Sequence, residues 1–295
     1  MKIYFMPVWG DSAETIYDTM KMQPPNSKGV WKNIEATLNM SEADYYIIQD
    51  YTDISLPDKN KIFCFAREVP KAGRVDNIEA LKSFSFLDDS SYLYTKWVYP
   101  QDNFNGMKIS YDSLTLQGPV EKTSNLICIQ SGKYFLEGHK KRVDFINKVI
   151  WNNTDKMDLC GSIRGVISYG GPGEHYVSDK FEKLKNYRYC LAFDNGRYNN
   201  YFGTQFTDAI LSWTIPIYWG APNISDFFPE DSYINLDVND PHSFEKNILN
   251  ELDDDDYQRR LPALKKARDL ILNKYNIWPT IHEALNTGKV TWGQE

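Results

Sequence analysis

Short apolar runs alternate with amphipathic segments along the second half of the chain. Phe206, Ala209, Ile210 and Trp213 recur at the i, i+3, i+4, i+7 spacing that lines one face of a helix. The pattern predicts strands at Leu126–Gln130, Met157–Gly161, Tyr189–Phe193, Ile215–Trp219 and Tyr233–Leu236, and helices at 138–151, 178–187 and 204–213. Strands that alternate with helices form parallel βαβ units, so this half predicts a parallel α/β domain.

The first half carries a similar but weaker pattern. It predicts strands at Lys2–Pro7, Tyr45–Gln49 and Lys61–Ala66, separated by polar, helix-capable segments, with an irregular stretch at 83–122. We therefore expect domains at 1–122 and 123–275 and a helical tail at 276–295. Two consecutive α/β halves predict two Rossmann-like domains facing each other across a cleft, with ligands beyond the carboxyl ends of the strands.

Composition and charge narrow the classes of protein that fit this pattern. The 295 residues carry a net charge of -7, which does not favour broad attraction to nucleic acid or to an anionic membrane. No apolar run approaches the roughly 18 residues of a membrane span, and no signal core follows the start MKIYFMPVWG. The sequence therefore predicts a cytoplasmic protein without a membrane span, in a host cytoplasm if the protein is viral.

Cysteine, histidine and aspartate spacings give no sign of a metal or a disulfide framework. The four cysteines are scattered and form no CxxC pair, which favours free buried thiols, and the four histidines lack metal-ligand spacing. The acidic run Asp253–Asp256 precedes a helical stretch, where carboxylates suit the helix dipole better than a metal. We expect no bound metal and no cofactor.

The run GHKKRVDF, residues 138–145, places four basic side chains at the start of a predicted helix. Cations there oppose the helix dipole, so His139, Lys140, Lys141 and Arg142 predict an anion site, with Arg142 offering a rigid fork for a diphosphate. A solubilising surface turn fits the same residues.

Two further stretches lie where predicted strands end. Gly203, Thr204 and Gln205 open a helix whose free N–H groups could seat a phosphate, although many such corners look alike. Glu68, in KIFCFAREVP, would project at the carboxyl end of a strand and could act as a general base. A surface ion pair with Arg67 is the simpler interpretation of Glu68.

The segments MDLCGSIRG, LKNYRYCLAFDNG and YFGTQFTDAILSWTIPIYWGAPNISDFFPEDSYINLDV resemble the donor-binding half of family 10 glycosyltransferases, the α1,3/4-fucosyltransferases. Hallmarks of that family are a strand ending in Phe-Glu-Asn, a Tyr-x-Thr-Glu-Lys helix start and a Val/Ile-Pro-Ile strand ending in Gly. The resemblance is strong over roughly 125–240. Over 1–122 it rests mainly on the strand ending in Glu-x-Pro at 68–70.

The resemblance implies a GT-B fold and an inverting transfer from a nucleotide-sugar without an obligatory metal. It also implies that Glu68 is the catalytic base and that Arg142 holds the donor diphosphate. The remaining positions at its donor motifs are Asp194, Asn195, Tyr201, Gly203, Thr204 and Gln205, and the basic run adds Lys141 as a candidate for donor binding.

The chain departs from the family at the donor motif. Asp194 replaces the Glu of Phe-Glu-Asn, and Gly203-Thr204-Gln205 replaces Thr-Glu-Lys, so an acidic ribose contact and a phosphate-binding lysine are both missing. Lys140 or Lys141 could supply the missing charge. We expect a soluble inverting glycosyltransferase that uses GDP-fucose or another NDP-sugar and a glycan acceptor. The alternatives are a phage-type DNA glycosyltransferase acting on hydroxymethylated bases, and an inactive nucleotide-sugar-binding or glycan-binding relative.

Overall fold

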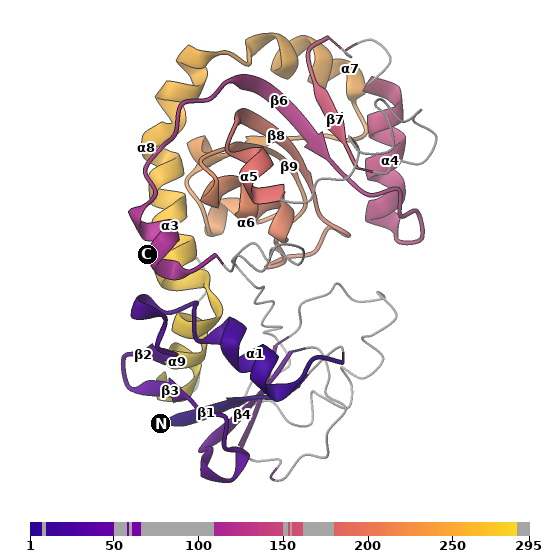
Figure 1. Ribbon diagram of the computed structural model, residues 1–295. Coiled ribbons are helices and arrows are strands. Elements are labelled where there is room, and N and C mark those ends of the chain that lie inside the picture. The colour runs from indigo at the N-terminus through magenta and orange to yellow at the C-terminus, as the bar shows by residue number, and fades with distance from the viewer. Residues whose placement is uncertain are drawn as a thin grey trace. The chain divides into compact units, whose positions relative to one another are not determined.

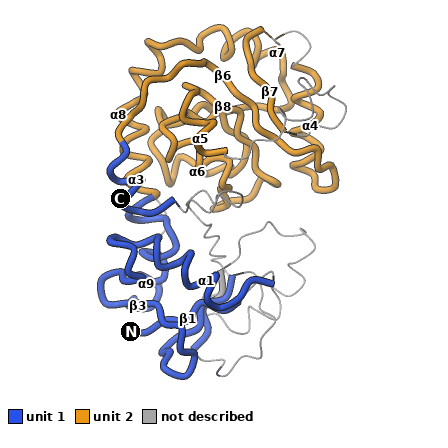
Figure 2. Tube along the Cα trace, in the orientation of Figure 1, with its two compact units in different colours: residues 1–101, 106–117, 272–292 blue, residues 102–105, 118–271, 293–295 orange. Residues whose placement is uncertain are grey.

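The structure is a computed structural model that describes residues 1–7, 10–49, 58, 61–65, 109–149, 153, 155–161 and 180–287. The chain divides into two compact units, shown in Figures 1 and 2. Unit 1 takes residues 1–101, 106–117 and 272–292, and unit 2 takes 102–105, 118–271 and 293–295. The chain therefore returns to unit 1 at residue 272, after the stretch 118–271 that forms most of unit 2.

Unit 1 is built on a five-stranded sheet of order β2-β3-β1-β4-β5. β1 runs parallel to β3 and β4, β4 runs parallel to β5, and only β2 is antiparallel to its neighbour. The strands are β1 (Lys2–Phe5), β2 (Val30–Trp31), β3 (Ile34–Ala36), β4 (Tyr45–Gln49) and β5 (Ile62–Phe65). The sequence predicts β1, β4 and β5, and it misses the short β2–β3 hairpin.

The α-helices of unit 1 that lie in the described residues are α1 (Ala13–Met20), α3 (Tyr111–Leu116) and α9 (Ile277–Thr287). α1 begins where the Ser12 side chain accepts a hydrogen bond from the Thr15 N–H. α3 begins with a reciprocal cap between Ser110 and Ser113, inside the stretch predicted to be irregular. That prediction is wrong for 111–116, because the cap stabilises a helix too short to show an apolar period.

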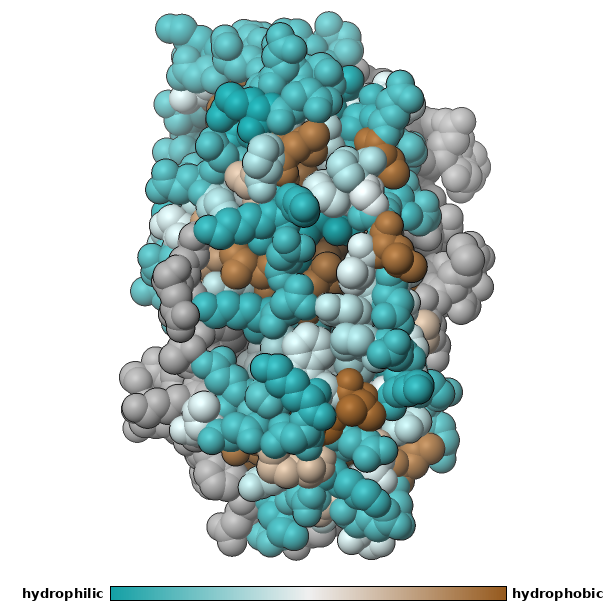
Figure 3. Space-filling view, turned by 90° about the vertical axis from the view of Figure 1, so that its left-hand side faces the viewer, coloured by the Kyte–Doolittle hydropathy of each residue, from teal (hydrophilic) through white to brown (hydrophobic). Residues whose placement is uncertain are grey.

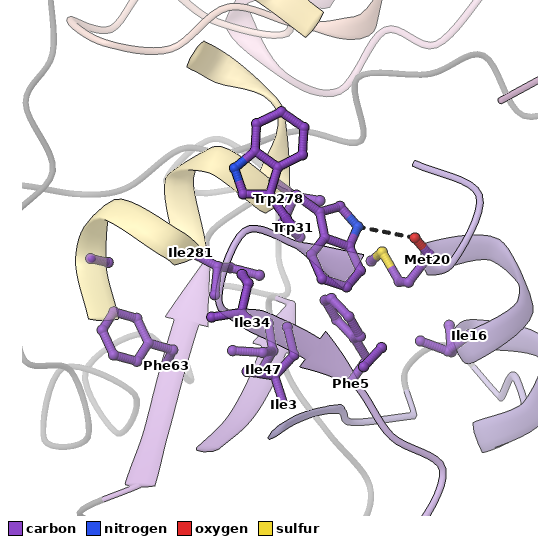
Figure 4. Close-up of a cluster of buried hydrophobic side chains, with 13 residues drawn as sticks. Ile3, Phe5, Ile16, Met20, Trp31, Ile34, Ile47, Phe63, Trp278 and Ile281 are labelled. Atoms are coloured by element: carbon purple, nitrogen blue, oxygen red, sulfur yellow. Dashed lines mark hydrogen bonds between the residues drawn. The ribbon is translucent and has the colours of Figure 1, made fainter. Parts of the chain in front are cut away.

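The core of unit 1 joins its sheet to α1 and α9. Apolar side chains from β1, β3 and β4 pack with Ile16 of α1 and with Trp278 and Ile281 of α9, as Figure 4 shows. The Trp278 indole N–H donates to the Met20 carbonyl over 3.0 Å, and its ring meets Phe5 edge to face. The segment that the sequence assigns to a helical tail thus supplies part of the core of unit 1.

Unit 2 is built on five parallel strands in the order β10-β9-β8-β6-β7. They are β6 (Ser124–Ile129), β7 (Asp158–Cys160), β8 (Tyr187–Phe193), β9 (Ile215–Trp219) and β10 (Ile234–Asn235). After β6 the chain turns toward β7, and after β8 it turns the other way toward β9. The carboxyl ends of β6 and β8 therefore flank a topological switch point, where open α/β sheets bind ligands.

The helices of unit 2 follow the predicted alternation with the strands. They are α4 (Glu137–Val149), α5 (Lys180–Leu184), α6 (Thr204–Leu211), α7 (Pro241–Ser243) and α8 (Asp254–Leu270). Asp253 caps α8 by accepting from the Asp256 N–H, which confirms the acidic run as a helix start. The predicted α/β class with two Rossmann-like units is confirmed, and the predicted cleft between the units stays a prediction.

The surface of the molecule is mostly polar on the face that Figure 3 shows. Apolar residues form small separate patches on this face. Within the described ranges, none of the helices has the length and apolar character that crossing a membrane requires. Cys128, Cys160 and Cys190 are buried free thiols, as predicted, and the Cys64 side chain lies outside the described residues.

Candidate functional site

The switch point of unit 2 collects most of the residues that the sequence singles out. The loop after β6 leads into α4, which carries Lys141 and Arg142, and the loop after β8 begins with Asp194 and Asn195 and leads into α6. Both loops leave the carboxyl edge of the sheet from neighbouring strands. The described part of the candidate site is therefore formed within unit 2.

Arg142 is the main charged group at this edge. Its side chain is buried, with 3% exposure, and its terminal nitrogen donates to the carbonyls of Ser131 over 3.0 Å and Lys133 over 3.4 Å. No carboxylate among the described residues pairs with it, and its Nε–H has no acceptor. Burial lowers the pKa of Arg142. A buried guanidinium without a counter-charge is a strong indication of an anion site.

A second contact joins α4 to the loop after β8. The His139 ring nitrogen Nε2 lies 3.0 Å from the Asn195 side-chain oxygen, and His139 is buried. Gly138 lies so close that an added Cβ would stand 2.4 Å from the Asn195 carbonyl carbon. The sequence names His139 only as part of a basic run. Its contact with Asn195 depends on chain segments more than fifty residues apart.

Lys141 points along the carboxyl edge of the sheet. Its ammonium lies 3.2 Å from Glu137 and 5.9 Å from the centre of the Trp219 ring, which ends β9. Glu137 is highly exposed, so this i, i+4 ion pair is weak. Glu137 therefore neutralises the Lys141 charge only in part. Lys141 thus adds positive charge near the ends of β8 and β9.

Asp194 forms a buried pair with Tyr218 of β9. The Tyr218 hydroxyl donates to the Asp194 carboxylate and accepts from the Ala221 N–H over 2.8 Å. Burial, together with the Asp194 charge, raises the pKa of Tyr218 well above its ordinary value. A Cβ on Gly220 would lie 2.3 Å from the carboxylate, so the glycine leaves space for the pair. Through Tyr218, Asp194 therefore ties the loop after β8 to β9.

The start of α6 carries the altered donor motif. Gly203 is the N-cap and provides no side-chain cap, while Thr204 is exposed and Gln205 is half-buried. Tyr201 is buried, with its ring edge-on to Tyr198. The open N–H groups at Thr204 and Gln205 are donors suited to an anion.

Lys180 of α5 is a neighbour of this helix that the sequence does not reveal. Its ammonium donates to the Asp208 carboxylate over 2.7 Å and to the Thr204 carbonyl over 3.3 Å. The other Asp208 oxygen is buried without a partner, and burial raises the pKa of Asp208. Lys180 thus ties α5 to the first turns of α6, and its charge is matched by Asp208.

Glu68 and Arg67 lie outside the described residues, as does the glycine-rich stretch 169–177. In the described ranges no cluster of three or more His, Cys, Asp or Glu side chains could hold a metal ion. The structure brings Arg142, Lys141 and Asn195 to the carboxyl edge of the unit 2 sheet. Asp194, which precedes Asn195, is buried. The structure places Gly203, Thr204 and Gln205 at the start of the helix that follows.

Two α/β units with parallel sheets in one chain are the plan of GT-B glycosyltransferases. Residues 122–260 match the family model described as the C-terminal domain of glycosyltransferase family 10, the fucosyltransferases. Over these residues the chain is similar to that family, as its motifs predict.

Two curated fucosyltransferases are also similar to part of this chain. An alpha-(1,3)-fucosyltransferase of Helicobacter pylori is 35% identical over 39% of this chain and 21% of its own length. GDP-fucose protein O-fucosyltransferase 3 of Danio rerio is 30% identical over 27% of this chain and 18% of its own length. The matches thus span about a fifth of these curated relatives. The crystal structure of an alpha1,3-fucosyltransferase with GDP covers 94% of this chain and 91% of that one, with 18% identity and a TM-score of 0.47.

Proposed function

We propose that this protein is an inverting glycosyltransferase that transfers a sugar from a nucleotide diphosphate to an acceptor hydroxyl. GDP-fucose is the donor that the family domain favours, and a glycan is the expected acceptor. The observation that carries the proposal is the buried Arg142 at the switch point of a domain similar to family 10, with no carboxylate partner among the described residues. A diphosphate is a ligand that suits both a planar cation and the N–H groups at a helix start.

The residues of unit 2 suit the charge changes of such a reaction. As the acceptor oxygen bonds to the anomeric carbon, the bond to the donor phosphate breaks and its electron pair passes to the diphosphate. Arg142, Lys141 and the start of α6 would stabilise that growing negative charge without a metal. Glu68 would take the proton of the acceptor hydroxyl, a role that rests on the sequence resemblance.

A donor panel tests the proposal directly. The protein is incubated with GDP- and UDP-sugars, and slow hydrolysis of the donor is followed in the absence of an acceptor. We expect turnover of one GDP-sugar and a rise in melting temperature with GDP. Silence across the panel together with no thermal shift by any nucleotide would contradict the proposal.

Matched variants separate an enzyme from a binding relative that has lost turnover. Glu68→Gln should remove turnover and keep nucleotide affinity. Arg142→Met should weaken GDP binding by about tenfold or more, because it removes a charge-assisted contact with the diphosphate. Arg142→Lys is the control for charge alone and should restore only part of the affinity, because an ammonium lacks the planar fork. Nucleotide binding without turnover in the unchanged protein would identify the binding relative.

A further inference from the structure

Helix α4 contacts both loops that flank the switch point. Gly138, His139 and Arg142 lie on its buried face, with His139 and Arg142 three positions apart and therefore neighbours along the helix. Arg142 donates to the loop after β6 at Ser131 and Lys133, and His139 bonds Asn195 in the loop after β8. One helix face thus connects the two edges of the candidate anion site.

The His139 ring is held in one orientation. The Leu136 N–H approaches Nδ1 at 3.4 Å, so Nδ1 is the acceptor and Nε2 carries the hydrogen that is donated to Asn195 Oδ1 over 3.0 Å. The Phe135 ring stands edge-on to the imidazole at 4.6 Å. Partners on both ring nitrogens fix the tautomer and the direction of the donor.

Gly138 brings the two backbones into direct contact beside this hydrogen bond. An added Cβ would lie 2.4 Å from the Asn195 carbonyl oxygen and 2.7 Å from the Gly196 nitrogen. Any side chain at position 138 would push the loop after β8 away from α4. The glycine therefore allows the close approach that the His139–Asn195 bond requires.

We propose that His139 is a positioning residue for the diphosphate site, holding the Asn195 loop at a fixed distance from Arg142. The proposal rests on the proposed function, because it deepens the account of the same site. A preformed site loses less entropy on binding than one whose two loops must be brought together. Without the His139 bond, the loop after β8 has to be ordered by the ligand, and binding weakens.

The test compares His139→Phe with His139→Gln, and uses His242→Gln, an exposed histidine of α7, as the matched control. Phe fills the space of the ring without a donor, whereas the Gln amide can donate to Asn195. GDP affinity is measured by titration calorimetry, and KM and kcat are measured for donor hydrolysis. We expect His139→Phe to weaken GDP and raise KM by about five- to tenfold, the loss of one neutral hydrogen bond, with kcat nearly unchanged. His139→Gln should recover most of the affinity, and the control should match the unchanged protein.

Asn195→Ala removes the same bond from the other side and serves if His139→Phe does not fold. In a double-mutant cycle, the combined variant should lose no more affinity than the weaker-binding single variant, because both changes break one interaction. Unchanged GDP affinity in folded His139→Phe, or in Asn195→Ala where His139→Phe does not fold, overturns the inference alone. Absence of nucleotide binding in the unchanged protein overturns the proposed function and the inference with it.

Discussion

Lys122 and Arg142 are two buried cations of unit 2 that face neutral oxygen atoms, yet only one is fully satisfied. The Lys122 ammonium donates to the carbonyls of Lys185 and Ser212 over 3.0 and 2.9 Å and to the Thr214 hydroxyl over 3.2 Å. These three acceptors use all of its donors. Arg142 retains a buried N–H without an acceptor. Lys122 is therefore a structural residue, and Arg142 is suited to a ligand.

Lys122 should make the stability of unit 2 depend on pH. Burial lowers the pKa of Lys122 to about 7 from an ordinary value of 10.5. Between these values the unfolded chain binds a proton that the folded chain has released, so the contribution of Lys122 to the free energy of unfolding rises with pH. Urea unfolding at about pH 6.5, 8 and 9.5 should show the unchanged protein gaining stability relative to Lys122→Met, by at most about 1.4 kcal/mol per pH unit. Parallel pH curves would contradict this assignment.

Tyr218→Phe should destabilise the loop after β8. The change leaves the buried Asp194 carboxylate without its tyrosine donor, which costs about 1–3 kcal/mol or more. Thermal unfolding measures the loss, and GDP affinity should fall with it. Tyr233→Phe is the control, because Tyr233 also packs on Phe206 but its hydroxyl has no hydrogen bond within the described residues. Equal melting temperatures for the two variants would show that the Asp194 pair is unimportant.

At the scale of elements, the alternation of apolar runs predicts the parallel sheet of unit 2 well, because its strands β8 and β9 are buried on both faces. β9 has its predicted bounds, while β8 begins two residues earlier, at Tyr187. Short elements fixed by polar caps are missed, as α3 shows with its Ser110–Ser113 cap. The sequence predicts Arg142 as an anion ligand from local pattern and resemblance. It cannot predict Lys180 beside α6 or His139 beside Asn195, because each contact joins distant segments.

The start of α6 offers a test by restoring the family motif. Thr204 is exposed and Gln205 is half-buried at a helix start that lacks acidic residues and a side-chain cap. If a GDP-sugar is the donor, Gln205→Lys should tighten GDP binding about tenfold through one charge-assisted hydrogen bond. Thr204→Glu should also raise the melting temperature slightly, because a carboxylate suits the helix dipole.

Titration calorimetry with GDP and UDP measures the gain in nucleotide affinity. Thr204→Gln is the control for Thr204→Glu, because it lacks the added charge. Tighter binding of both nucleotides by Gln205→Lys would indicate contact with the diphosphate alone. No gain in affinity for either nucleotide would contradict the placement of the diphosphate at this helix start.

At the scale of the whole molecule, the two compact units differ in how their cores are assembled. Unit 2 takes its sheet and helices from one stretch of the chain, 118–271, apart from short segments, whereas the core of unit 1 joins β1 and β4 to α9. The sequence predicts a helical tail at 276–295 but gives no information on the partner of this helix. Its contacts in the structure, among them those of Trp278 and Ile281, assign it to unit 1.

Trp278→Ala should unfold unit 1 selectively. Trp278 is fully buried, packs on Phe5 and donates to Met20, so its truncation should cost about 3–5 kcal/mol. Hydrogen exchange should show faster exchange in β1, β4 and α1, while β6, β8 and α4 keep their protection. Leu285→Ala, at a partly buried position of the same helix, is the milder control. Uniform loss of protection in both units would show that they unfold together.

The late position of α9 in the chain also affects the order in which the two cores are completed during synthesis. The described strands and helices of unit 2 are complete once residue 271 has been synthesised. The strands of unit 1 are synthesised first, but the apolar face of their sheet that packs on α9 stays uncovered until Trp278 and Ile281 have been synthesised. The core of unit 1 is therefore completed only after Trp278 and Ile281 have been synthesised, later than the stretch 118–271 that supplies unit 2.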